Sequence, residues 1–302
     1  MPDAVGTALL RRYIGRRFAA LRTAAGLTQE QAAEAFQRSR AMIARIEAGD
    51  ERVRFREVDV RLLLDIYKAS PEDAKVLLEL TAETRNGRRK SWWHDRTDTE
   101  LPEFFELYVL LEDSAVAIRQ YEAELIPGLL QTRGYAELIS EVTIGYFSED
   151  ERQRLVNTRM KRQALLSRPN PPSLEVIINE SALRRLDVSN EVAREQLRHL
   201  LEDRPHVNVR VLPFSAGIHG GMATCGSFSI LDFPADPYTG APIEPPLAYV
   251  DTLTAAFYMN KPDEVRGYQH MWRDLDRRAL DRPTSREFIS DILKGRSSCP
   301  TT

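Results

Sequence analysis

Arginine side chains gather around a short segment near the start of the chain, and their chemistry is the most definite in the sequence. Arg38, Arg40 and Arg45 lie close together around Ser39 and Ala41. The guanidinium group donates a planar fork of hydrogen bonds that matches the edge of guanine and the oxygens of phosphate. Such side chains near the start of a helix fit the major groove of DNA. The segment therefore predicts contact with DNA.

Two helices joined by a tight turn are needed to position these arginines. Thr28 with Gln31 has the pattern of a capping box, which begins a first short helix. Ser39 supplies a second cap, so a second helix is expected from Arg40 to Glu47, ended by Gly49. An ordinary helical hairpin is the alternative. It explains apolar residues on the buried face of the second helix, but not the arginines on the opposite face.

The segment resembles a helix-turn-helix of the Cro/cI or XRE type over about the first seventy residues. The resemblance depends on four groups of residues, Gly26-Leu27-Thr28-Gln29, Ala32-Ala33, Ile43 and Ile46-Glu47-Ala48-Gly49. It implies that Gln29 binds a phosphate, that Ser39, Arg40, Ala41 and Arg45 face the groove, and that Glu47 pairs with an arginine inside the domain. Gln37 stands where this motif usually has glycine, so it must adopt a backbone conformation that is easier for glycine.

Three more helices are expected around the motif, at residues 9–25, 56–67 and 71–84. Arg52 and Arg54 lie in the loop that follows the second motif helix, where contact with the DNA backbone is expected. One such domain reads only a short half-site, so we expect a dimer on a pseudo-palindromic operator. The predicted DNA-binding residues are Gln29, Arg38, Ser39, Arg40, Ala41, Arg45, Arg52 and Arg54.

The charge of the chain is divided along its length. Residues 1–70 contain 13 Lys and Arg against 9 Asp and Glu, a balance of +4, whereas the whole chain of 302 residues carries −3, so the remainder carries −7. A basic N-terminal region, here called the head, followed by an acidic remainder, the body, is typical of a DNA-binding domain joined to a sensing or interaction module. A chance split of a few charges would give the same numbers.

The length and composition predict a domain at 1–84, a linker at 85–91, a regulatory domain at 92–295 and a flexible tail at 296–302.

The two cysteines have neither disulfide nor zinc spacing, and no segment has the composition of a signal peptide or a membrane span. A cytoplasmic protein without metal or cofactor is therefore expected.

The second half of the chain predicts helices and strands in mixed order. In 102–123 apolar residues recur at helical spacing, and Trp92 and Trp93 are expected to anchor the segment before it. We expect an α+β protein, with an all-α five-helix head and a larger body of helices packed on a small, mostly antiparallel sheet. The other predicted body helices are 133–140, 149–167, 191–202 and 262–280, and the predicted strands are 174–179, 207–212, 228–233, 247–251 and 255–259.

The body resembles the C-terminal domain of actinomycete XRE regulators of the WhiJ-like, antitoxin-like class. The signature is Pro127, Gly128, Leu129, Leu130, Gln131 and Thr132, with further matches such as Glu112, Tyr121, Arg159, Arg162-Gln163, His219 and Tyr249-Val250. The resemblance implies control by a small partner protein encoded by a neighbouring gene. The usual glutamate after the Tyr-Val pair is Asp251 here.

Two other functions remain open for the body. One is binding of a small-molecule effector in a pocket between Trp92 and Trp93, the Pro127 loop and the sheet. The other is hydrolase chemistry by His219, Cys225 and Asp251, which lacks supporting spacing or a nucleophile elbow. The glycine-rich loop 217–221 lacks the pattern of a phosphate-binding loop and is expected to be a hairpin loop. We therefore expect that the body is not an enzyme.

Overall fold

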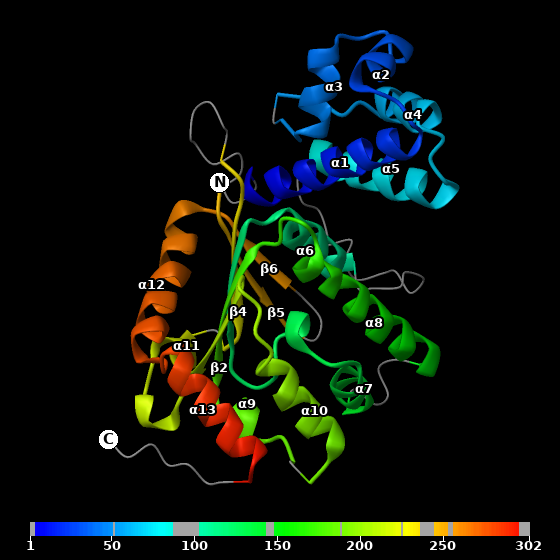
Figure 1. Cartoon of the computed structure of the whole chain (residues 1–302). Coiled ribbons are helices and arrows are strands. Elements are labelled where there is room, and N and C mark those ends of the chain that lie inside the picture. Colours follow the sequence, from blue (N-terminus) through cyan, green and yellow to red (C-terminus); the bar gives the residue numbers. More distant parts are fainter. Residues whose placement is uncertain are drawn as a thin grey trace. The chain divides into compact units, whose positions relative to one another are not determined.

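The structure is a computed structural model that describes residues 4–50, 52–86, 103–142, 148–187, 189–224, 226–235, 245–252 and 256–295. The chain forms two compact units, Met1–Asp95 and Arg96–Thr302, which we call the head and the body (Figure 1). Trp92, Trp93, Cys225, the tail 296–302 and most of the predicted linker 85–91 lie outside the described residues. None of the described helices is long and apolar enough to cross a membrane.

The head contains the five predicted helices. They are α1 (Ala4–Ala24), α2 (Gln29–Ala35), α3 (Arg40–Glu47), α4 (Glu57–Ile66) and α5 (Pro71–Asn86). Both sides of the expected capping box are present at Thr28 and Gln31. Ile14, Phe18, Phe36, Ile43 and Leu63 are buried. The local caps and the apolar spacing thus predicted the start of α2 and the bounds of α3 to α5 to within two residues, whereas α1 begins five residues earlier than expected.

Helix α1 passes very close to α3. A Cβ atom added at Gly15 would lie 2.5 Å from the carbonyl oxygen of Glu47 and 2.6 Å from that of Ile46. Real side chains are not found at such distances, so only glycine allows this approach. The contact fixes the C-terminal end of α3 against the longest helix of the head.

The body is built on a six-stranded mixed sheet. Its order is β3-β2-β1-β4-β5-β6, with β1 paired parallel to β2 and β2 parallel to β3, while the other three pairs are antiparallel. The strands are β1 (Ala117–Glu122), β2 (Ser173–Asn179), β3 (Val207–Leu212), β4 (Phe228–Asp232), β5 (Leu247–Asp251) and β6 (Ala256–Met259). The predicted fold class is confirmed, although the parallel part of the sheet was not foreseen.

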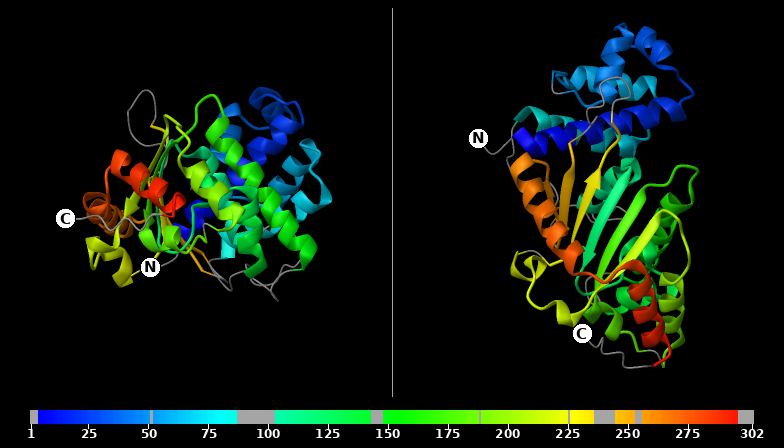
Figure 2. Two further views of the ribbon diagram at one scale, coloured as in Figure 1. Left: turned by 60° about the horizontal axis from the view of Figure 1, so that its bottom comes forward. Right: turned by 60° about the vertical axis from the view of Figure 1, so that its left-hand side comes forward.

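Helices cover both faces of this sheet (Figures 1 and 2). On one face Trp272 and Leu275 of α12 (Pro262–Arg278) pack on Tyr121, Ile177 and Phe228. The opposite face is covered by α6 (Glu103–Ser114) and α8 (Glu149–Arg162). The remaining elements are η2 (Gly128–Leu130), α7 (Arg133–Val142), η3 (Gln163–Ser167), α9 (Glu180–Arg184), α10 (Glu191–Leu200), η4 (Phe214–Ala216), α11 (Gly220–Thr224) and α13 (Arg282–Leu293).

The edge of the sheet at β3 is covered by the segment that joins α12 to α13. The backbone N–H of Val211 donates to the hydroxyl of Ser285 at 3.0 Å, and the N–H of Leu280 donates to the carbonyl of Val211 at 2.9 Å. Arg210 donates to the carbonyl of Leu280 at 2.9 Å. The segment from α12 to α13 therefore satisfies backbone groups that an exposed edge strand would leave unpaired.

The predicted helix 102–123 is wrong in its second half. Helix α6 ends at Ser114, and β1 follows as a central strand. Ile118 and Tyr121 are three residues apart, which in a helix puts them on one side. In a strand they point to opposite faces, and both are buried because both faces of the sheet are covered. The apolar spacing was therefore compatible with either structure.

Two further expectations are corrected near the C-terminus. The loop 217–221 is not a hairpin loop, because β3 and β4 are not neighbours, and the connection crosses the sheet through η4 and α11. The helix predicted at 262–280 ends at Arg278 and is followed by α13, which was not predicted. Asp281 caps α13 by accepting a hydrogen bond from the N–H of Thr284 at 2.9 Å.

Candidate nucleic-acid interface

Helix α3 presents one polar face and one buried face. The hydroxyl of Ser39 accepts a hydrogen bond from the N–H of Met42 at 3.3 Å, which caps the helix as expected. Ile43 and Ile46 are buried in the head. Arg40 and Ala41 are exposed, and Arg45 is partly exposed. The face predicted to enter a DNA groove is therefore accessible within the head.

A partly buried ion pair fixes the orientation of α3. Arg22 Nε lies 2.6 Å from one carboxylate oxygen of Glu47, and Arg22 Nη2 lies 3.1 Å from the other. The same guanidinium donates to the carbonyl of Leu27 at 2.7 Å, and the bond to Glu47 raises the pKa of Arg22. The prediction that Glu47 pairs with an arginine inside the domain is confirmed. The pair joins the ends of α1 and α3.

Gln29 takes part in this same network. Its side-chain amide donates to Glu47 at 2.8 Å, so it ties the first residue of α2 to the last residue of α3. The contact predicted for Gln29 was a phosphate. In the structure its amide has an internal partner, and its role at DNA stays a prediction.

Carboxylates lie against the predicted DNA-binding arginines, a feature that sequence reasoning missed. Arg40 pairs with Glu30 at 2.7 Å and Arg38 lies 4.0 Å from Asp59. Arg52 donates to Asp50 at 2.9 Å, a bond that lowers the pKa of Asp50 to about 2. Most of these groups are exposed, and exposed pairs contribute only about 0–1 kcal/mol. Phosphate can therefore replace a carboxylate at small cost.

The predicted arginines fall into two places on the head. Arg40, Ala41 and Arg45 lie on α3. The other predicted arginines line a groove of about 400 Å³ beside α4. The floor of this groove is apolar and includes Phe36, Val53 and Phe55. The arginines of this groove are Arg38, Arg52, Arg54 and Arg56. Base edges stay the predicted partner of the first group, and the DNA backbone stays the predicted partner of Arg52 and Arg54 in the second.

Gln37 adopts the backbone conformation expected from its place in the motif. Its φ is +55°, in the left-handed region that favours glycine, and only Lys68 at +53° shares this feature among the described non-glycine residues. The turn between α2 and α3 is therefore formed with glutamine at some conformational cost.

The signature residues of the body, 127–132, are mostly buried and connect neighbouring helices. Leu129, Leu130, Gln131 and Thr132 are buried, and the carboxamide of Gln196 on α10 bridges two of them. It accepts from the N–H of Thr132 at 2.7 Å and donates to the carbonyl of Leu130 at 2.8 Å. On α8, Arg159 donates to the side chain of Gln131 at 3.0 Å. These residues hold three helices together and do not form an exposed docking surface.

A buried ion pair lies between α6 and α8. Arg162 Nε is 2.8 Å from a carboxylate oxygen of Glu112, and their side chains are 8% and 1% exposed. The guanidinium carbon of Arg162 lies 5.1 Å from the ring centre of Phe105 and 5.8 Å from that of Tyr108. Burial raises the pKa of Glu112, and Arg162 opposes this effect. The matches at Glu112 and Arg162 are thus explained by packing.

His219 and Asp251 have different charged neighbours. Burial lowers the pKa of His219, next to Arg278 and Asp274 of α12. Burial raises the pKa of Asp251, at the end of β5, and Arg162 and Arg159 of α8 oppose the shift. Since α12 and α8 lie on opposite faces of the sheet, the structure does not bring these two members of the suggested triad together. The third member, Cys225, lies outside the described residues.

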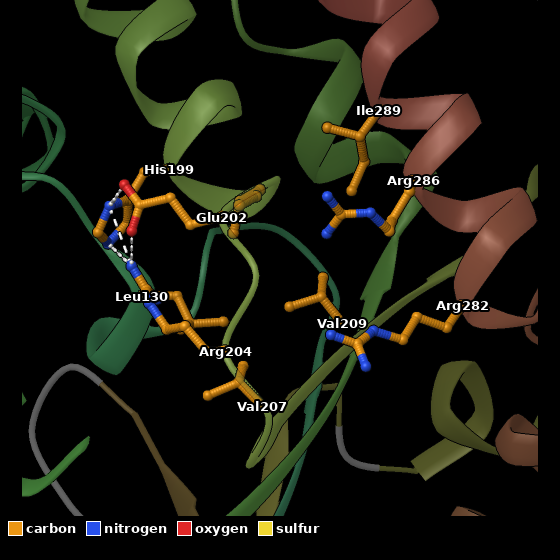
Figure 3. A pocket seen from close by; sticks show the side chains of 10 residues that line it. Leu130, His199, Glu202, Arg204, Val207, Val209, Arg282, Arg286 and Ile289 are labelled. Atoms are coloured by element: carbon orange, nitrogen blue, oxygen red, sulfur yellow. Dashed lines mark hydrogen bonds and ion pairs between the residues drawn. The ribbon is translucent and has the colours of Figure 1, made fainter. Parts of the chain in front are cut away.

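A small hollow between α10, β3 and α13 contains three arginines (Figure 3). Arg204 pairs with Glu202 at 2.6 Å, Arg282 pairs with Asp203 at 2.7 Å, and Arg286 donates to the carbonyl of Leu201 at 2.6 Å. Each guanidinium group already has a protein oxygen as partner within the described part of the chain. We do not regard this hollow as an anion site.

Comparison with known families agrees with the division into head and body. Residues 14–77 match the family described as "Helix-turn-helix domain", a class of DNA-binding domain. Residues 105–291 match the family described as "Domain of unknown function (DUF5753)". Because this second match covers more than half of the chain, the protein belongs to the DUF5753 family. No curated protein matches the chain. No solved structure matches it either.

Proposed function

We propose that the protein is a sequence-specific, dimeric transcriptional regulator, controlled through its body. The observation that carries the proposal is the exposed polar face of α3, held in place by the partly buried pair of Arg22 and Glu47. A rigid helix with arginines on its free face can read base edges in a major groove. A cytoplasmic protein that associates with the nucleoid fits this role.

The test is binding to the promoters that flank its own gene, compared with random DNA. Arg40→Ala is expected to reduce the preference for the operator by about fivefold or more, since one bidentate contact with guanine is worth about 1–3 kcal/mol. Arg61→Ala is the matched control, because Arg61 is also an exposed arginine in an ion pair but lies on α4 outside the predicted set. Equal loss on operator and random DNA would assign Arg40 to phosphate contact instead.

The body is proposed to receive a small partner protein encoded by a neighbouring gene, in the manner of an antitoxin. The support is the resemblance to WhiJ-like regulators. Because the signature residues 127–132 are mostly buried, the partner would bind another surface of the body. A salt titration of operator binding, with and without the neighbouring small protein, tests this control. Identical salt curves in both arms would contradict it.

The body is further proposed to lack enzymatic activity. The different surroundings of His219 and Asp251 support this proposal. Hydrolase turnover that disappears in His219→Ala would overturn it. A small-molecule effector is the second candidate for control of the head, and one cavity of the body favours it.

A further inference from the structure

A cavity of about 590 Å³ opens at the carboxyl ends of the parallel strands of the body. It is lined by Tyr121 at the end of β1, Asn179 at the end of β2 and Pro213 just after β3. The connection from β3 to β4 closes its other side. In open α/β sheets this crevice is the usual place for ligands, and the volume suits a small organic molecule.

The inner wall of the cavity is polar and buried. The hydroxyl of Tyr121 lies 3.5 Å from Nε2 of His219, and it accepts a hydrogen bond from the side chain of Asn179 at 3.4 Å. His219 is only 4% exposed, and its Nδ1 has no hydrogen-bond partner among the described residues. A buried ring nitrogen without a hydrogen-bond partner costs free energy, so a bound molecule that supplied a partner would be stabilised there.

The packing of this wall requires glycine at position 221. A Cβ atom there would lie 2.8 Å from Cε1 of Tyr121 and 3.2 Å from Nδ1 of His219. The backbone of α11 can therefore approach the two rings only because Gly221 has no side chain. The glycines that the sequence placed near His219 thus shape this cavity.

The outer wall is apolar and faces solvent. Phe214, Ile218 and Met222 line the cavity and are 60%, 85% and 66% exposed, which places them among the most exposed large apolar side chains of the described residues. Exposing several large apolar side chains to water at one cavity is unfavourable and unusual in a folded protein, unless a bound molecule covers them. A bound molecule with an apolar body would cover all three.

The cavity holds no uncompensated charge among its described residues. Glu124 pairs with Arg185, and burial lowers the pKa of His219, so that its ring is neutral at neutral pH. A charged ligand would be desolvated there without a counter-ion. A neutral ligand with a hydroxyl or carbonyl group would find Tyr121, Asn179 and His219 as hydrogen-bond partners.

We propose that this cavity binds an uncharged small molecule with an apolar body and a single hydroxyl or carbonyl group at one end. The polar end meets Tyr121 and His219, and the apolar body lies against Phe214, Ile218 and Met222. The site differs from the effector pocket predicted at the Pro127 loop. Its regulatory meaning depends on the proposed function, but its ligand binding does not.

The test uses the full chain without DNA and the neutral fluorophore N-phenyl-1-naphthylamine as probe. We expect saturable binding to one site per chain, displaced by 1-octanol and not by octanoate at the same concentration. Ile218→Glu is expected to weaken probe binding by about tenfold or more, because a charge enters the apolar wall. Val142→Glu is the matched control, since Val142 is also a highly exposed apolar residue but lies on α7 away from the cavity.

A second variant tests the polar end. Tyr121→Phe keeps the ring and removes the hydroxyl, so it should retain probe binding while 1-octanol displaces the probe about threefold to tenfold less effectively. No saturable probe binding, equal binding by Ile218→Glu and the wild type, or competition by octanoate would each overturn the proposal. Probe binding with no operator binding would refute only the regulatory function. A different pair of results would assign the apolar surface of Phe214, Ile218 and Met222 to protein contact. These results are that the wild type binds no probe, and that Ile218→Glu removes the effect of the neighbouring small protein on operator binding.

Discussion

Arg40 and Glu30 face each other across the turn of the motif, with Arg40 Nε 2.7 Å from a carboxylate oxygen of Glu30 and side chains 66% and 62% exposed. The arginine predicted to read DNA thus pairs with an acidic residue of the preceding helix. An exposed pair of this kind is weak, so it orients Arg40 without preventing its exchange to a DNA partner.

Glu30→Gln is therefore expected to strengthen DNA binding. It removes a negative charge near the phosphates and frees Arg40, and a gain of about threefold to tenfold in affinity corresponds to about 0.6–1.4 kcal/mol. Fluorescence anisotropy with operator DNA measures the effect. The control is Glu57→Gln, which removes an exposed carboxylate paired with Arg61 on α4. If the two variants gained equally, the effect would be one of net charge and not of Arg40.

Gln37→Gly is expected to stabilise the head. A residue with a side chain pays about 1–2 kcal/mol to adopt the left-handed conformation, and glycine avoids this cost. Glycine also has more conformational freedom in the unfolded chain, which lowers the free energy of unfolding by about 0.5–1 kcal/mol. The difference is a small net gain in stability. Thermal unfolding measures it. Lys68→Gly at the α4–α5 turn has nearly the same φ and should gain a similar amount. A lower melting temperature for Gln37→Gly would mean that its side chain stabilises the turn.

Arg162→Met is expected to destabilise the body strongly. It leaves Glu112 buried without its counter-charge, and loss of one partner of a buried pair costs about 3–5 kcal/mol. The double variant Glu112→Leu with Arg162→Met should recover much of this loss, because no charge remains to be buried. Denaturant unfolding of the single and double variants gives the coupling. Equal loss in both would show that packing over Phe105 and Tyr108 matters more than charge.

Glu122 should make the body less stable as pH rises from about 5 to 7. Burial raises the pKa of this carboxyl to about 7 in the folded protein, with hydrogen bonding to Ser227 acting in the opposite direction. The folded state then holds a proton that the unfolded state has already released, so stability is greatest below the unfolded pKa and falls as pH approaches 7. Melting temperatures of the wild type and Glu122→Gln across this range should converge at low pH. Parallel curves would contradict the raised pKa.

The head was predictable from sequence because its structure is determined locally. Thr28, Gln31 and Ser39 act on amides within the next turn of the chain, and such signals are visible in the order of residues. The unusual backbone of Gln37 was visible for the same reason. The pairing of Arg40 with Glu30 was not, because it depends on how two helices cross.

The body was harder because its sheet joins distant segments. Tyr121 pairs in register with Ile177 on one side and Phe228 on the other, so the strand character of 117–122 depends on residues far along the chain. The cavity is formed by the ends of β1 and β2 and by the connection after β3. No spacing within any one of these segments indicates the others. His219 was noticed in the sequence, but its buried contact with Tyr121 required the fold.

The cover over β3 has a consequence for how the protein is made. The groups that satisfy this strand, at Leu280 and Ser285, are among the last described residues of the chain. During synthesis from the N-terminus, the edge of β3 therefore stays open until residues 280–285 have left the ribosome. A truncated chain ending before Leu280 would keep that edge open permanently, and association with other nascent chains through it would compete with folding.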